Sequence, residues 1–193
     1  LFFNKNIAMK FIQNLLLYIS AFIPMYFLIV VNIFLDILND NLTFNVLNTT
    51  MIITLSVLII LGSFGVIWAI KFNRDKNIKI IILERKNTTD QHFLGYFSLF
   101  VLFALSFELE KVSEACVFAI ILILVGIVYI NNKLFYINPF LNILGYNFYD
   151  IKYKLQNSGE EKSAKIFYRG NLDLSKNYEI NLKNDNFSFL TKC

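Results

Sequence analysis

Long runs without a single charged residue constrain the fold of this chain more than any other feature. The four runs cover residues 11–35, 41–70, 93–107 and 115–132. A helix needs about 20 mostly apolar residues to cross a hydrocarbon core of about 30 Å. Only 17% of the residues are charged, against roughly a quarter in soluble chains. We therefore expect residues 1–137 to form an all-α transmembrane bundle of four helices, with spans at about 11–35, 51–72, 93–108 and 113–132.

The placement of Lys and Arg predicts the orientation, because short cytoplasmic segments retain positive charge and translocated ones do not. The amino-terminal segment, the loop 71–92 and the tail after residue 132 are all basic, and every Lys and Arg except Lys111 then lies on one side. Trp68, Tyr96 and Tyr129 fall near that same interface, as in an aromatic belt. Both termini and the loop 71–92 are thus expected in the cytoplasm.

Two polar segments are expected to form a small cytoplasmic module rich in β-structure. Residues 78–84 are β-branched, and residues 150–156 alternate between apolar and polar side chains, which is typical of strands. Further strand candidates follow within the tail, residues 150–193. Since two strands alone are marginal in water, we hypothesise that residues 78–84 pair with the tail.

Between the bundle and the tail, residues 138–149 form a predicted interfacial junction. Asn138 precedes Pro139, which suits the first turn of a helix, and Gly145 and Tyr146 follow as a stop. One reading is a short interfacial helix that redirects the chain. The other is a lever that passes a change in the bundle to the cytoplasm, and the sequence leaves both readings open.

Within the spans, a few residues indicate bending and close packing. The first run is longer than the apolar region of about 7–15 residues in a signal peptide, so we interpret it as an uncleaved anchor. Pro24 removes a backbone hydrogen bond and predicts a kink there. Gly65 with Ala69, and Ala115 with Ala119, have the spacing of small residues that permits close helix contact.

Residues suited to catalysis are sparse. His92 is the only histidine and has no ligand partners at metal-binding spacing. Cys116 and Cys193 fall on opposite sides of the predicted bundle, which excludes a disulfide between them. The glycines form no phosphate-binding loop. We expect no enzyme, no cofactor and no metal site.

The net charge of +4 has two readings, topology and nucleic-acid binding. The basic residues of the tail are interleaved with acidic ones and form no dense cluster, whereas nucleic-acid binding requires a concentrated basic face. Topology is the better reading, and no direct nucleic-acid binding is expected.

The string NPFLNILGY at residues 138–146, and the loop 79–90 leading straight into the third predicted span, resemble the KwaA family. That family supplies the membrane subunit of Kiwa-type anti-phage defence systems. The resemblance implies a bacterial inner-membrane protein that self-associates, senses disturbance of the envelope and engages a cytosolic KwaB-like effector. It implies no catalytic residues. The loop 71–92 and the tail 150–193 are then the expected docking surface for the effector, and lipid surrounds the bundle.

Two other functions remain open on the sequence. A membrane immunity protein against a toxin or bacteriocin would share the same composition, as would a small pore or transport accessory subunit. Ion and substrate pathways commonly place ionisable groups within spans, and the predicted spans contain none in their interiors.

Overall fold

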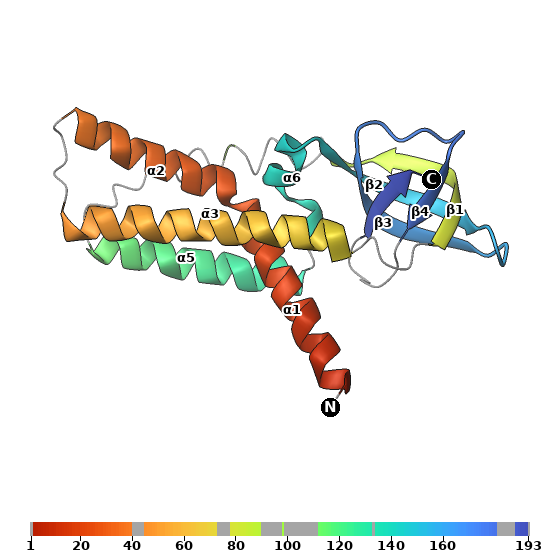
Figure 1. Ribbon diagram of the computed structural model, residues 1–193, viewed down its shortest axis with the longest axis horizontal. Coiled ribbons are helices and arrows are strands. Elements are labelled where there is room, and N and C mark those ends of the chain that lie inside the picture. The colour runs from red at the N-terminus through yellow and green to blue at the C-terminus, as the bar shows by residue number, and fades with distance from the viewer. Residues whose placement is uncertain are drawn as a thin grey trace.

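The computed structural model describes residues 2–39, 45–72, 78–89, 112–132, 134–180 and 188–192, together with Ser98. Helices run along one part of the molecule and a small barrel of strands caps one end (Figure 1). The helices are α1 Phe2–Ala21, α2 Ile23–Leu38, α3 Val46–Phe72, α5 Val112–Asn131, the 3-10 turn η1 Leu134–Tyr136 and α6 Pro139–Ile143. The strands are β1 Ile78–Asn87, β2 Tyr146–Leu155, β3 Glu161–Arg169, β4 Asn177–Ile180 and β5 Ser188–Lys192.

Two of these helices are each long and apolar enough to cross a membrane, Val46–Lys71 and Val112–Asn131. A third crossing arises if Phe11–Ala21 and Ile23–Leu38 are counted as one broken span, which bends by 46°. Both α3 and α5 run towards the barrel, so their carboxyl ends lie at its side (Figure 1). The helices carry large exposed apolar side chains, such as Ile60 and Ile123, which suits a surface in contact with lipid.

The prediction of an all-α bundle of four helices is wrong. The described residues contain a closed five-stranded barrel, and among them only two unbroken helices, or three crossings with the bent pair, meet the requirements of a span. The predicted span 93–108 lies outside the described residues, apart from Ser98. The prediction was based on the length of the runs without charged residues. That length indicates neither a break inside a run nor the pairing of distant strands that closes a barrel.

The barrel has the closed strand order β1-β2-β3-β5-β4. Its neighbours are antiparallel except for β3 and β5, which pair in parallel through Ile166 with Ser188 and Phe167 with Phe189. β1 pairs with both β2 and β4, so the strand that precedes α5 does pair with the tail that follows it. Closure pairs the strand edges with one another, and open edges are what make small sheets prone to association.

At one end of the barrel, both faces of the wall are buried. The inner face lies in the barrel core, and the outer face packs in the core of the helices. Tyr149 and Ile166 point into the barrel core, whereas Phe148, Phe167 and Phe189 belong to the same core as the helices. Successive residues of a strand face opposite sides, so buried neighbours such as Phe148 and Tyr149 indicate a wall covered inside and out. The three phenylalanine rings thus form the contact between barrel and helices.

Candidate functional site at the helix break and the barrel junction

The first apolar segment is broken at Phe22. Helix α1 ends at Ala21, and α2 begins at Ile23 with Pro24 in its first turn. Proline lacks the N–H that would otherwise need an acceptor in the helix interior, so it fits the start of a helix better than the middle. The 46° bend therefore lies two residues before the predicted kink at Pro24, because the proline begins the second helix.

A buried asparagine joins this break to the barrel junction. Asn138 is 1% exposed, and its Nδ2 donates to Ser20 Oγ at 2.8 Å and to Leu17 O at 3.3 Å. Its Oδ1 accepts from the Leu141 backbone N at 3.1 Å, which makes Asn138 the N-cap of α6. One side chain is thus bonded at the same time to the last turn of α1 and to the first turn of α6.

Aromatic rings surround the break. The Tyr18 ring lies 5.1 Å from Phe22 and 5.4 Å from Tyr129, and Tyr129 lies 5.5 Å from Phe135, measured between ring centroids. The hydroxyl of Tyr18 donates to the carbonyl of Leu122 in α5. The hydroxyl of Tyr129 donates to Ile137 O at 3.0 Å. Two helices and the junction are therefore held together around the bend by rings whose polar ends are satisfied.

Glycines let the helices approach closely at this point. A Cβ at Gly65 would lie 2.5 Å from Leu16 Cβ, and one at Gly62 would lie 2.9 Å from Ser20 Cα. A Cβ at Gly126 of α5 would lie 2.9 Å from a ring carbon of Tyr18. Since real Cβ atoms do not come so near, Gly62 and Gly65 let α1 approach α3, and a larger residue at Gly126 would force the Tyr18 ring to move.

The junction continues directly into the barrel. Leu141 of α6 is fully buried, and α6 is followed by Gly145, whose φ of 83° favours glycine. The Gly145 carbonyl accepts from the Gly170 N–H at 3.1 Å, beside the end of β3. Tyr146 then opens β2 with its ring 5.6 Å from that of Phe189. Only residues 139–145 lie between the buried asparagine and the first residue of β2.

The residues singled out from the sequence lie in different places. Asn138 and Pro139 are buried at the break, while Gly145 and Tyr146 lie where the junction enters β2. Gly65 contacts α1, and Ala69, one turn later, is fully buried.

The other predicted residues that the structure describes lie on α3 and α5. On α5, Ala115 is half-buried and Ala119 is exposed. Tyr129 is buried among the rings at the break, Trp68 of α3 is half-buried, and Tyr96 lies outside the described residues.

Sequence reasoning missed Tyr18, Ser20, Gly62 and Gly126. The spacing of Gly62 and Gly65, on adjacent turns of one helix face, was an available sign of a close helix crossing. Nothing local to Ser20 points to Asn138, which is 118 residues away along the chain.

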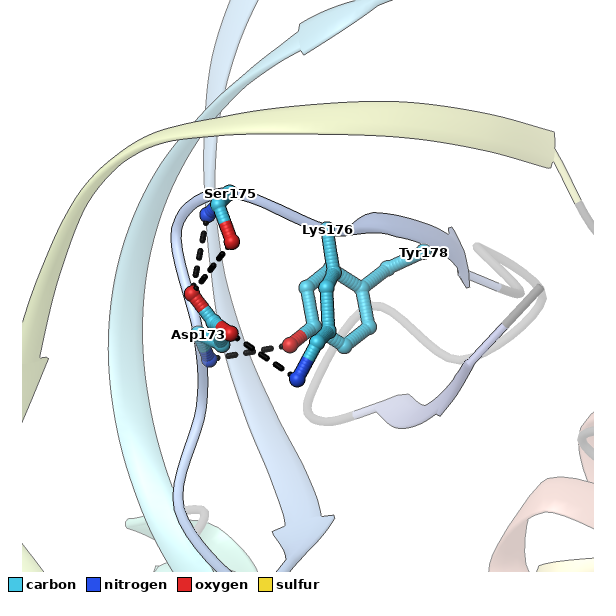
Figure 2. A network of polar contacts seen from close by, with 4 residues as sticks. All are labelled: Asp173, Ser175, Lys176 and Tyr178. Carbon is cyan, nitrogen blue, oxygen red and sulfur yellow. Dashed lines mark hydrogen bonds and ion pairs between the residues drawn. The ribbon is translucent and has the colours of Figure 1, made fainter.

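At the surface of the barrel, a polar network fixes the loop between β3 and β4 (Figure 2). The Asp173 carboxylate accepts from Ser175 N at 3.0 Å, from Ser175 Oγ at 2.8 Å and from Lys176 Nζ at 2.9 Å. The Asp173 N–H donates to the hydroxyl of Tyr178 at 2.9 Å. The hydrogen bond from Lys176 is the first cause that holds the pKa of Asp173 well below its ordinary value, and those from Ser175 add to it. Leu174 lies between the bonded residues Asp173 and Ser175 and is exposed.

The outer wall of the barrel carries charges of both signs. Lys152 of β2 pairs with Glu84 of β1 at 2.7 Å, and Lys162 pairs with Glu160 at 2.9 Å. The hydrogen bond from Lys152 to Glu84 raises the pKa of the lysine. Exposed pairs of this kind contribute little to stability. Among the described residues, no group of three or more His, Cys, Asp or Glu side chains could hold a metal ion.

The site therefore consists of a bent pair of apolar helices, a buried polar link and a small barrel. No curated protein and no solved structure matches the chain. A family model described as anti-phage protein KwaA matches residues 13–189. That match covers the second part of α1, all of α2, the break, the junction and nearly the whole barrel. The chain belongs to the KwaA family of anti-phage proteins.

Proposed function

We propose that this chain is a non-enzymatic sensor and anchor subunit of a phage defence system, which detects perturbation of the envelope and engages a cytosolic effector. Membership of an anti-phage family supports the defence role, and the apolar helices support a place in the membrane. The observation that carries the proposal is the bonding of Asn138 to both α1 and α6.

The break supplies an element that can respond to the bilayer. A span that does not match the local thickness adjusts by tilting or bending, at a cost of fractions of a kcal/mol per ångström. The angle between α1 and α2 can change at Phe22, where the helical ladder is interrupted. Because Asn138 is bonded to the last turn of α1, a change in that angle must either break those bonds or move α6 relative to α2.

Movement of α6 would be passed to the barrel. Leu141 is packed in the same core as Phe148 and Phe167 of the barrel wall. Packed cores change between discrete arrangements rather than deforming continuously. A small change at the break would therefore reposition the barrel as a unit.

The proposed location is the bacterial inner membrane, crossed more than once, with the barrel and both termini in the cytoplasm. Two features support this orientation, because basic segments are retained in the cytoplasm. The last turn of α3 carries Lys71, and the carboxyl end of α3 lies on the side of the barrel (Figure 1). The barrel itself is rich in Lys and Arg.

The proposed partners are a cytosolic KwaB-like effector and further copies of the same chain. The effector would dock on the barrel, through the loop 71–92 and the tail 150–193. Exposed Ile81 and Leu83 on β1 and Leu174 on the fixed loop offer apolar contacts, with mixed charges around them, as protein interfaces commonly do. Self-association would use exposed apolar positions of α5 such as Ala119 and Ile120.

Two alanine variants of the junction test the proposal. Asn138→Ala removes the link between α1 and α6, while Asn142→Ala alters the same residue type one turn later, where the side chain is only half-buried. In cells challenged with phage, Asn138→Ala should lose protection at an unchanged amount in the membrane, and Asn142→Ala should protect like the wild type. Full protection by Asn138→Ala would refute the proposed coupling.

A further inference from the structure

An apolar groove of about 370 Å³ opens beside the break. Each of the four long helices contributes to its wall, for example Leu15 of α1, Tyr26 of α2, Leu58 of α3 and Ile127 of α5. Both limbs of the bent span therefore line one space. The groove lies beside the glycine contacts, and Gly126 and Tyr18, which meet there, are part of its wall.

The chemistry of the groove suits hydrocarbon. Its wall is apolar apart from the side chains of Tyr18, Tyr26 and Asn131, and the Tyr18 hydroxyl already donates to the Leu122 carbonyl. An apolar space of this kind does not hold water well, and an empty one forfeits dispersion contacts along its lining. The occupant should be apolar and narrow.

The position of the groove selects among apolar occupants. Ile123 and Ile127 line it and are also 63% and 51% exposed on the outer surface of α5, so the groove is continuous with the surface that faces lipid. It extends to Asn131, the last residue of α5, where a headgroup would meet an amide. A helix with its side chains is about 10–12 Å across, so a whole helix does not fit within about 370 Å³.

We propose that one acyl chain of a membrane phospholipid occupies this groove. The proposal rests on the proposed function, because it names the ligand that would couple the state of the bilayer to the angle between α1 and α2. Since α1 and α2 both line the groove, the angle between them and the occupancy of the groove are linked, and each must shift the other. A change in the packing of the acyl chains of the bilayer would therefore change the angle between α1 and α2.

Photolabelling in liposomes tests this proposal. The full chain is reconstituted in phosphatidylethanolamine vesicles that contain a phospholipid with a diazirine on its acyl chain, and labelled peptides are mapped after irradiation. Peptides of α1 and α5 that line the groove should be labelled. Ile127→Trp fills the groove and should lower this labelling about tenfold, because overpacking an apolar site costs on the order of a factor of ten in affinity.

The matched control is Leu124→Trp on the same helix. Leu124 is 57% exposed and is not part of the groove wall, so this variant should label like the wild type. Leu15→Trp fills the groove from α1 and repeats the test if Ile127→Trp inserts poorly. Equal labelling of all these proteins would mean that only surrounding lipid is detected, and would overturn the proposal.

Two other outcomes would also overturn it. Crosslinks between two copies at the groove would assign the groove to a second chain, and crosslinks to residues 93–107 would assign it to a segment of the same chain. The vesicles contain neither phage nor effector, so the result does not depend on the defence assay with Asn138→Ala. Failure of one test is therefore distinguishable from failure of the other.

Discussion

Replacing Asn138 by alanine should lower the free energy of unfolding, because the side chain is buried and makes three hydrogen bonds. The substitution removes two donated hydrogen bonds, to Ser20 Oγ and Leu17 O, and one accepted from Leu141 N. Each such bond contributes about 1 kcal/mol net, and a lost N-cap alone costs about 1 kcal/mol. The Leu17 carbonyl keeps a donor, because Ser20 Oγ also donates to it at 2.7 Å. The expected loss in the free energy of unfolding is therefore about 2–3 kcal/mol.

The free energy of unfolding can be measured by titrating SDS into mixed micelles and following the fluorescence of Trp68, the single tryptophan. Asn142→Ala is the control, with an expected change within about 0.5 kcal/mol. A cycle with Ser20→Ala isolates the bond between the two side chains, and its coupling energy should be about 1 kcal/mol. Equal effects of Asn138→Ala and Asn142→Ala, or a coupling energy near zero, would refute the assignment of Asn138 as the link.

Gly65→Ala should lower the free energy of unfolding by about 1–3 kcal/mol, because its Cβ would lie 2.5 Å from Leu16 Cβ; the same titration measures this. Phe189→Ala removes a ring between barrel and helices and should cost about 3–5 kcal/mol, with faster proteolysis of the barrel. In the folded chain the pKa of Asp173 lies below 3.8. Its carboxylate therefore adds stability above pH 3.8, and this is lost as the pH falls through the folded pKa. The advantage of wild type over Asp173→Asn in barrel melting should shrink below pH 3.8.

Controls for these variants come from the same elements. Ser63→Ala removes a half-buried hydroxyl between Gly62 and Gly65 on α3, and Phe27→Ala removes a ring that is 59% exposed. Both should change stability little. The account of Gly65 would be contradicted if Gly65→Ala were as stable as Ser63→Ala. The account of Phe189 would be contradicted if Phe189→Ala did not change the cleavage rate of the barrel. The account of Asp173 would be contradicted if the stability difference between wild type and Asp173→Asn did not depend on pH.

Hydropathy alone located two membrane-type helices. The predicted spans 51–72 and 113–132 overlap Val46–Phe72 and Val112–Asn131, because a fully apolar helix is recognisable from its own residues. The run 11–35 was predicted as one helix with a kink, yet the structure breaks it at Phe22. Hydropathy does not distinguish a straight span from two shorter helices in sequence.

The barrel was beyond local reasoning for a different reason. Alternation within residues 150–156 indicates a strand, but not its neighbours. β1 precedes α5 and β2 follows it, and these two strands pair along most of their length. The parallel pairing of β3 with β5 is likewise non-local. Closure therefore depends on contacts that no single segment encodes.

The junction was identified in part. The string from Asn138 to Tyr146 carried the resemblance to the KwaA family, and the match over residues 13–189 confirms that family. The partner of Asn138 could not be found, since Ser20 is an ordinary residue in an apolar helix. Its hydroxyl already donates to Leu17 O within the same helix at 2.7 Å, so the cost of burying a polar side chain does not point to a distant partner.

The central claim is that a change in the bend moves the barrel through Asn138. It is tested most directly by the distance between spin labels at Phe34→Cys on α2 and Lys154→Cys on β2, in a chain with Cys116 and Cys193 replaced by serine. Both labelled positions are exposed. Between thin and thick bilayers the distance should shift in the wild-type background, and the shift should disappear with Asn138→Ala. A distance that is the same in both bilayers, or a shift that persists without Asn138, would contradict the account.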